Sequence, residues 1–284
     1  MKKLFLMIVG ALGSLAAFSQ MDIADGITVC HTSSTDKFAL LASNKEFSRQ
    51  HLKPQPYLYV SEVGKMVTFK TPDGKDASGF VIMTAKKTNN WIFVFQEWWG
   101  LNDHIKREAE KLYNDMGNVN VLALDMYDGK VATEPADAGK YMGEFKADRG
   151  TAIFKGALDF AGKSAKIGTI GWCFGGGLSL QASLTAGKQA VATVMYYGMP
   201  EEDVTKLKTL NSDVLNIWPT QDKWINKEVM DKFEANMKAA GKKLTVKAYD
   251  ADHAFANPSN PKFKEEFTAD AYKNTLDFFK ARLK

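Results

Sequence analysis

Three residues of the chain have the types and the order that covalent hydrolysis requires. Cys173 lies at the centre of residues 171–175 (GWCFG), a pattern typical of the turn that presents a nucleophile between a strand and a helix. Asp222 and His253 follow, each shortly after an apolar segment. Nucleophile, acid and histidine in this order can activate a thiol and form a thioester. We predict that Cys173 attacks, that His253 is the base and that Asp222 orients it.

The glycines of this turn have a mechanical role. Side chains two residues before and after the nucleophile would collide, which predicts glycine at Gly171 and Gly175. Glycine-rich turns also bind phosphates, but a phosphate loop requires lysine and then serine or threonine where Leu178 stands. A dinucleotide site requires an acid at the end of the next strand, where Tyr197 stands. The pattern therefore favours a nucleophile, and its alternative is a small buried cysteine.

The sequence offers more than one candidate for the acid of the triad, and it contains three further histidines. Asp250 and Asp252 compete with Asp222, but an acid from a neighbouring strand end is better placed to reach the imidazole of His253. The other three histidines are assigned to the N-terminal segment or to the first turn of a helix: His31, His51 and His104. None is paired at ligand spacing with another histidine or with a cysteine, so we expect no metal site and no cofactor.

The elements that must position these residues alternate along the chain. Residues 65–84 read as a β-hairpin, and residues 91–95 (WIFVF) as a strand buried on both faces. Further strands are expected at residues 119–124, 166–171, 191–197, 214–218 and 244–249, with helices at about 102–112, 149–163 and 177–186. This alternation predicts an α/β-hydrolase fold, with a mostly parallel central sheet, helices on both faces and an N-terminal hairpin.

The N-terminus differs from the rest. Lys2 and Lys3 precede a short apolar run and a small-residue cleavage site, so residues 1–19 are expected to be a signal peptide, with a membrane anchor as the alternative. Export would place the protein in the periplasm or outside the cell. Residues 20–61 read as an extension with a short helix at about 37–51, which could cover the site or a sheet edge. Residues 62–284 are expected to form the hydrolase domain.

Composition narrows the class of partner. The chain has 284 residues, 45% of them hydrophobic, and 37 Lys and Arg against 33 Asp and Glu. These scattered charges indicate no nucleic-acid partner, and no membrane partner for the mature form. The oligomeric state stays open. Cys30 could form a disulfide with Cys173 after export, although oxidation would abolish the reactivity that the turn predicts.

The sequence resembles the dienelactone hydrolases, cysteine members of the α/β-hydrolase superfamily. Beyond the nucleophile turn, the resemblance rests on residues 96–102 (QEWWGLN), 125–127 (DMY) and 253–256 (HAFA), and it covers about residues 62–284. It implies that Glu97 contacts the cysteine and takes its proton when substrate arrives, the alternative being a plain loop carboxylate. It also implies an oxyanion hole formed by the backbone N–H groups of Trp98 and Phe174.

The resemblance is incomplete at the substrate pocket. The family binds a substrate carboxylate through arginines, one of them shortly after the histidine, where this chain has Asn257. Lys130 is a candidate replacement. Five tryptophans are expected near strand ends around the site, either as pocket walls or as core: Trp98, Trp99, Trp172, Trp218 and Trp224. We therefore expect hydrolysis of a small, fairly apolar ester or lactone. A thioesterase or peptidase with the same triad, or a catalytically silent binding protein, is the alternative.

Overall fold

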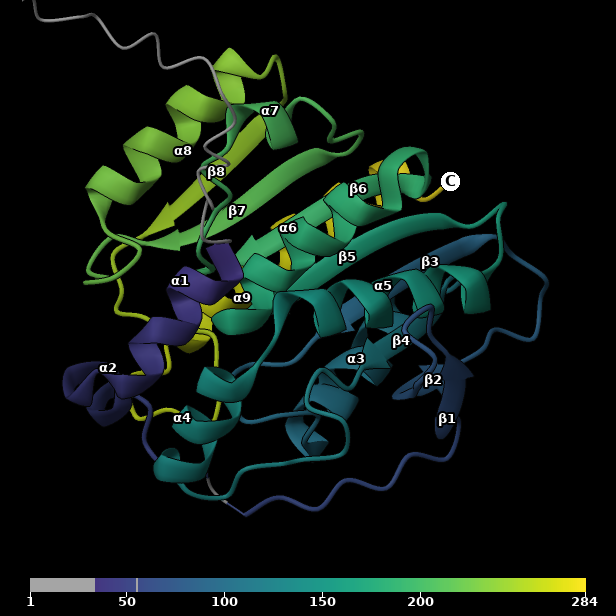
Figure 1. The fold of residues 1–284 in the computed structure, drawn as a ribbon, viewed down its shortest axis with the longest axis horizontal. Helices are drawn as coiled ribbons and strands as arrows, with labels where there is room; N and C mark the ends of the chain where they lie inside the picture. The colour runs from purple at the N-terminus through teal and green to yellow at the C-terminus, as the bar shows by residue number, and fades with distance from the viewer. Residues whose placement is uncertain (1–33, 55) are drawn as a thin grey trace, which may run out of the picture. The chain divides into compact units, whose positions relative to one another are not determined.

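Eight strands form one sheet in the computed structural model, which describes residues 34–54 and 56–284 (Figure 1). The strand order is β1-β2-β4-β3-β5-β6-β7-β8, and the six strands from β3 to β8 are parallel. The strands are β1 Lys65–Lys70, β2 Asp76–Ile82, β3 Asn90–Phe95, β4 Asn120–Leu124, β5 Lys166–Trp172, β6 Ala190–Tyr196, β7 Asp213–Pro219 and β8 Leu244–Tyr249. The predicted mostly parallel sheet is confirmed.

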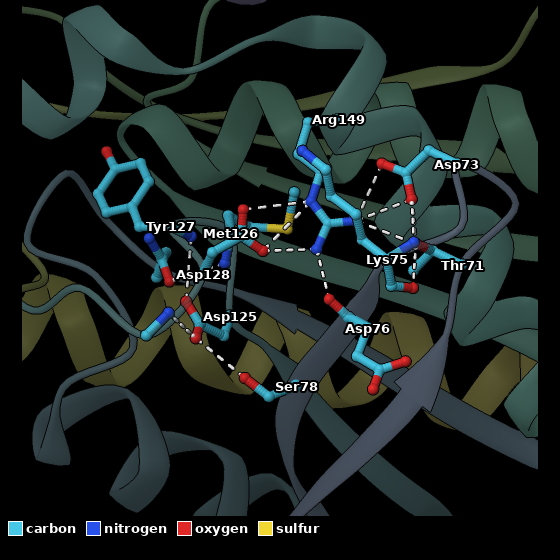
Figure 2. Close-up of polar contacts among 12 residues, drawn as sticks. Thr71, Asp73, Lys75, Asp76, Ser78, Asp125, Met126, Tyr127, Asp128 and Arg149 are labelled. Carbon is cyan, nitrogen blue, oxygen red and sulfur yellow. Dashed lines mark hydrogen bonds and ion pairs between the residues drawn. The ribbon is translucent and has the colours of Figure 1, made fainter.

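The predicted hairpin is also confirmed, and it joins the sheet through β4. β1 and β2 pair antiparallel, and β2 pairs antiparallel with β4. Figure 2 shows how Arg149 fastens the hairpin to the loop after β4. Its guanidinium donates to the backbone carbonyl of Asp76 at 2.7 Å and pairs with the carboxylates of Asp73 and Asp128. Charge-assisted contacts of this kind hold the antiparallel edge in place.

Helices cover both faces of the sheet. They are α3 Asp103–Met116, α4 Pro135–Glu144, α5 Ala147–Ala161, α6 Phe174–Ala186, α7 Val204–Leu207, α8 Lys227–Ala239 and α9 Glu265–Arg282, with a short 3-10 helix η2 at Gly187–Gln189. In Figure 1, α5 and α6 lie in front of the sheet and α9 lies behind it. α3 begins at the Asn102 cap, whose side chain accepts from the Ile105 N–H at 3.1 Å, and ends at Gly117 in the left-handed region.

The N-terminal segment forms two short helices rather than the single helix expected at about 37–51. They are α1 Ser34–Leu40 and α2 Lys45–Gln50, joined by the 3-10 helix η1 Leu41–Ser43. The break falls at Asn44, whose side chain caps α2 by accepting from the backbone N–H groups of Glu46 and Phe47. α1 packs against α6, and in Figure 1 this purple helix lies beside the start of α6.

Several expectations fall on residues outside the described ranges. They are the signal peptide at residues 1–19, His31 and Cys30. Within residues 34–54 and 56–284, no helix combines the length and the apolar character needed to cross a membrane.

Candidate active site

The turn after β5 has the strained backbone expected of a nucleophile elbow. Cys173 has φ 57° and ψ −120°, a combination that L-residues rarely adopt, and α6 begins at the next residue. A Cβ atom on Gly171 would lie 2.1 Å from the carbonyl oxygen of Gly175, and one on Gly175 would lie 2.3 Å from that of Gln96. Glycine is therefore required at both positions, as the sequence indicates.

α6 starts three residues earlier than expected. The glycines that read as turn in the sequence belong to the first turn of the helix. They are needed there because the helix lies close to the neighbouring backbone: a Cβ atom on Gly176 would lie 2.7 Å from the carbonyl oxygen of Tyr196. The positive end of the helix is thus placed directly at the sulfur of Cys173.

Asp222 and His253 meet at the same sheet edge. His253 Nδ1 lies 2.6 Å from Asp222 Oδ2, and both side chains are buried. The other oxygen of Asp222 accepts from the backbone N–H groups of Trp224 and Ile225. Although burial alone would raise it, the pKa of Asp222 is lowered by His253 and these hydrogen bonds. The carboxylate therefore stays charged and holds a proton on Nδ1 of the imidazole.

The competing acids are engaged elsewhere. Asp250 accepts a hydrogen bond from the side chain of Gln221 at 2.8 Å, and Asp252 forms an ion pair with Lys262 at 3.0 Å. Of the three candidates that the sequence offered, Asp222 is the one that the fold brings to His253.

The thiol of Cys173 is buried and free of disulfide bonding. Its Sγ lies within 4.8 Å of a ring nitrogen of His253. Burial raises the pKa of the thiol, although His253 and the backbone N–H of Phe174 act in the opposite direction. Burial alone would lower the pKa of His253, but the charge of Asp222 raises it above its usual range. The thiol and the imidazole share one proton: while the proton stays on the sulfur, as burial of the thiol favours, His253 is neutral and can act as a base.

A second imidazole, from a residue that the sequence analysis left in the extension, also reaches the thiol. Nε2 of His51 lies 3.5 Å from Sγ of Cys173, and Nδ1 of His51 lies 2.8 Å from the carbonyl oxygen of Phe47. The expectation of no metal-ligating cluster depended on sequence spacing. In the structure, His51, Cys173 and His253 bring three ligand atoms within 4.8 Å of one another. The one sequence signal is that Phe47 and His51, four residues apart, share a helix face.

Residues 34–51, which we call the cap, cover the site. Phe47 of the cap packs edge-on against Trp98 and Trp224 at ring distances of 5.5 and 5.1 Å, and Phe38 stacks on Phe174 at 6.1 Å. Both cap phenylalanines are buried completely or nearly so. Of the two roles that the sequence left open for this segment, the structure shows that it covers the site.

The carboxylate of Glu97, which the resemblance implied takes the proton of the cysteine when substrate arrives, is engaged by another residue in this structure. Its carboxylate accepts from the side-chain amide of Asn257 at 2.7 Å. Burial raises the pKa of Glu97 to about 7, while His253 and this hydrogen bond act to lower it. Asn257, which the sequence identified only as the residue standing where an arginine was expected, thus holds Glu97 near the site.

Beside Glu97 lies a cavity of about 40 Å³, room for very few water molecules. Its walls include Trp99, Trp172 and Tyr197, together with Arg107, which the sequence analysis did not single out. The other residues on its wall are Asn102, His104, Ile105, Glu108, Ala256, Asn257, Pro258 and Ser259. The cavity is therefore mixed, with aromatic walls and a few charged groups.

The remaining pocket candidates lie elsewhere. Lys130 is half exposed at the surface and forms an ion pair with Glu144 at 3.3 Å. Trp224 contacts Phe47 and His253 beneath the cap rather than lining the cavity. Trp218 donates its indole N–H to the carbonyl of Ile225 at 2.6 Å. Lys130 is not among the residues that line the cavity, so its ammonium group is held at the surface by Glu144 rather than in the cavity.

Comparison with known proteins places the chain in one family. A family model described as "Dienelactone hydrolase family" matches residues 78–283. The chain is 30% identical over 234 residues to "Protein usf" of Aquifex pyrophilus, covering 78% of this chain and all of that protein. It is 28% identical over 235 residues to a protein of Aquifex aeolicus (strain VF5) to which carboxymethylenebutenolidase activity is attributed, again covering 78% of this chain and all of the relative.

A solved structure gives the same fold. The chain resembles a dienelactone hydrolase-like promiscuous phosphotriesterase from metagenomic libraries with a TM-score of 0.67 and 22% identity. The match covers 78% of this chain and all of the other. The family match begins at residue 78, so it leaves the cap outside the matched region.

Proposed function

The chain belongs to the dienelactone hydrolase family and is a carboxylic ester hydrolase, and we propose that it cleaves small esters or lactones through a Cys173-His253-Asp222 triad. The observation that carries the proposal is the 2.6 Å contact between His253 Nδ1 and Asp222, with a ring nitrogen of His253 within 4.8 Å of the sulfur of Cys173. Placed at a strained turn, this set can form and then hydrolyse a thioester.

In the first half of the proposed cycle, the thiol loses its proton and its sulfur attacks the carbonyl carbon of the ester. Asp222 keeps the proton of His253 on Nδ1, so that Nε2 can accept a proton. The negative charge that develops on the carbonyl oxygen is stabilised by the backbone N–H groups of Phe174 and Trp98. Donors of this kind typically contribute about 3 kcal/mol each. The alcohol leaves with the proton, and an acyl thioester of Cys173 remains.

In the second half, water takes the place of the alcohol. His253 removes a proton from the water, whose oxygen attacks the thioester carbonyl. Collapse of the intermediate expels the sulfur and returns the proton to it, so that the carboxylic acid is released and the thiol is restored. Each group thus returns to its starting state without a cofactor.

Glu97 is proposed to assist the first half alone. Its pKa of about 7 lets the carboxylate accept a proton near neutral pH, and Asn257 holds it beside the cavity. Substrate that enters the cavity would displace this hydrogen bond and release the carboxylate toward the thiol. Glu97→Gln should therefore slow formation of the thioester more than its hydrolysis, as measured by burst kinetics. Equal slowing of the two phases would contradict this role.

The substrate is proposed to be small and at least partly aromatic or apolar. The support is the aromatic wall formed by Trp99 and Trp172 and the absence of Lys130 from the cavity. Export is proposed from residues 1–19, whose charged start and apolar run match a signal peptide. N-terminal sequencing of protein recovered from the periplasm or medium should begin after Ser19; a chain starting at Met1 in the membrane fraction would favour the anchor.

Hydrolysis of aryl acetates by the mature protein tests the enzymatic proposal. We expect turnover that persists in a chelator, because the proposed cycle uses a thiol and an imidazole. Cys173→Ala should abolish it. Full turnover in that variant would contradict the assignment of the nucleophile, whereas a Cys30→Ser variant should keep the activity of the parent protein.

A further inference from the structure

Two imidazole nitrogens face one sulfur in the closed site. Nε2 of His51 lies 3.5 Å from Sγ of Cys173, and the ligand atoms of His51, Cys173 and His253 all lie within 4.8 Å of one another. The triad explains one of these histidines. The other comes from the cap and has no part in the proposed cycle.

Both imidazoles are fixed with their lone pairs toward the sulfur. Nδ1 of His51 donates to the carbonyl oxygen of Phe47 at 2.8 Å, and Nδ1 of His253 donates to Asp222 at 2.6 Å. In a neutral ring this leaves Nε2 unprotonated in each case. The single thiol proton can satisfy only one of the two, and Nε2 of His253 has no hydrogen-bond partner among the described residues. A buried acceptor is thus left unpaired, which is costly.

A bound metal ion would satisfy all three atoms. Histidines that bind metals commonly donate the other ring N–H to a carboxylate or a backbone carbonyl, and here one does each. Tetrahedral zinc, with metal–sulfur and metal–nitrogen distances near 2.3 and 2.0–2.1 Å, places sulfur and nitrogen about 3.6 Å apart. The 3.5 Å between Sγ of Cys173 and Nε2 of His51 matches this separation, and the other two pairs of ligand atoms, which lie within 4.8 Å, would close toward it when the ion binds.

We propose that His51, Cys173 and His253 form a binding site for a thiophilic divalent ion such as Zn²⁺. On binding, the S–H bond breaks, a metal–sulfur bond forms, and the proton leaves for solvent. No electrons are transferred. The fourth position would be taken by water.

The site has a neighbouring cavity, and a bound ion would have a structural consequence. Tyr197, whose ring lies 5.0 Å from that of His253, lines this cavity together with Glu97, so the cavity lies one side chain away from the site. Because His51 belongs to the cap and the other two ligands belong to the hydrolase core, one ion would join the cap to the core. The same ion would occupy the nucleophile, so that metal-bound protein is closed and inactive.

Titration of the metal-free mature protein with Co²⁺ tests the site directly. A Cys30→Ser background removes the other cysteine. We expect one equivalent of Co²⁺ to give the near-ultraviolet thiolate-to-cobalt band and the intense visible bands of tetrahedral cobalt, and Zn²⁺ to displace them. His51→Gln should weaken Zn²⁺ binding at least about 10-fold, and Cys173→Ser should abolish the thiolate band. His104→Gln, a change of the same type on the cavity wall, should leave both unchanged.

Two results would overturn the proposal. One is equal Zn²⁺ affinity in the parent protein and in His51→Gln; the other is octahedral cobalt without a thiolate band. X-ray absorption spectroscopy of the zinc-bound protein identifies the zinc ligands without any variant. We expect one sulfur and two imidazole nitrogens bound to the zinc. The hydrolase proposal is judged separately, by aryl acetate turnover of the metal-free protein, so the two can fail independently.

Discussion

The strand-end triad and the cap meet at one sulfur atom but reach it in different ways. Cys173, Asp222 and His253 each follow a strand of the parallel sheet, so the order of the strands is sufficient to bring them together. His51 comes from the cap, 122 residues before Cys173 in the chain, and is placed by the packing of Phe38 and Phe47. The first arrangement is a property of the fold, whereas the second depends on a few aromatic contacts.

The difference predicts that the triad is rigid and that the cap is the part that opens. The Cys173 turn is enforced by backbone contacts at Gly171 and Gly175 that leave no room for change. The cap is held by two buried phenylalanines and by surface ion pairs such as Lys37 with Glu202 at 2.9 Å. Exposed pairs typically contribute less than about 1 kcal/mol each. Substrate therefore has a route to the thiol if the cap moves.

The largest expected effect of the remaining tests belongs to the triad. Asp222→Asn should lower kcat by about 10³- to 10⁴-fold, since an amide can stabilise the wrong tautomer of His253. Steady-state hydrolysis of an aryl acetate measures this. Asp250→Asn and Asp252→Asn are matched controls and should keep near-parental turnover. A large loss in either control, with little loss in Asp222→Asn, would mean that the fold brings a different acid to the histidine during catalysis.

Most of the triad and of the sheet could be predicted from the sequence because local patterns carry them. The glycine spacing around Cys173 and the apolar runs before Asp222 and His253 each identify a strand and the residue at which it ends. Because the strands are parallel, their carboxyl ends, and with them the three residues, lie at the same edge of the sheet. The start of α6 was missed because Gly176 reads as turn, although its missing side chain serves a close helix-to-strand contact.

The cap could not be predicted in the same way. Its position depends on which aromatic surface Phe38 and Phe47 find, and that surface is assembled from Trp98, Trp224 and Phe174 on three different loops or helices. The contact between Glu97 and Asn257 is missed for the same reason, since 160 residues separate the partners. Such side-chain contacts leave no periodic signal in the sequence.

A smaller effect is expected when the cap is loosened. Phe47→Ala removes a fully buried ring, a change that typically costs about 3–5 kcal/mol where packing is tight. If the cap opens as a unit, alkylation of Cys173 should become at least about 10-fold faster. Mass spectrometry of the peptide that contains Cys173 measures this rate. Leu40→Ala changes an exposed apolar residue of the cap and should have no such effect. An unchanged rate in Phe47→Ala would show that reagents reach the thiol without cap opening.

The smallest effect is a change of stability with pH. Burial lowers the pKa of His51 from 6.5 to about 3, so the unfolded chain binds the proton more readily between these values. His51 therefore contributes stability above pH 6.5 that is lost as the pH falls toward 3, by up to about 1.4 kcal/mol per pH unit. Urea unfolding in chelator at pH 7 and 5 should show a loss in the parent protein that is about 2 kcal/mol larger than in His51→Gln.

The comparison with the variant isolates His51 from Glu97, which acts in the opposite direction. Burial raises the pKa of Glu97 to about 7, so its contribution to stability increases as the pH falls from 7 toward 4.5. Glu97 is present in both proteins and cancels in the difference. The same acid dependence in the parent protein and in His51→Gln would contradict the buried, neutral state of His51.

Trapping of the covalent intermediate tests the catalytic assignment most directly. An aryl acetate is mixed with the mature protein, the reaction is quenched during the first turnovers, and the acetylated peptide is identified by mass spectrometry. We predict one acetyl group on Cys173 that appears with the first release of phenol and disappears as substrate is exhausted. Release of phenol with the acetyl group on another residue, or with none on Cys173 at any time, would contradict the account.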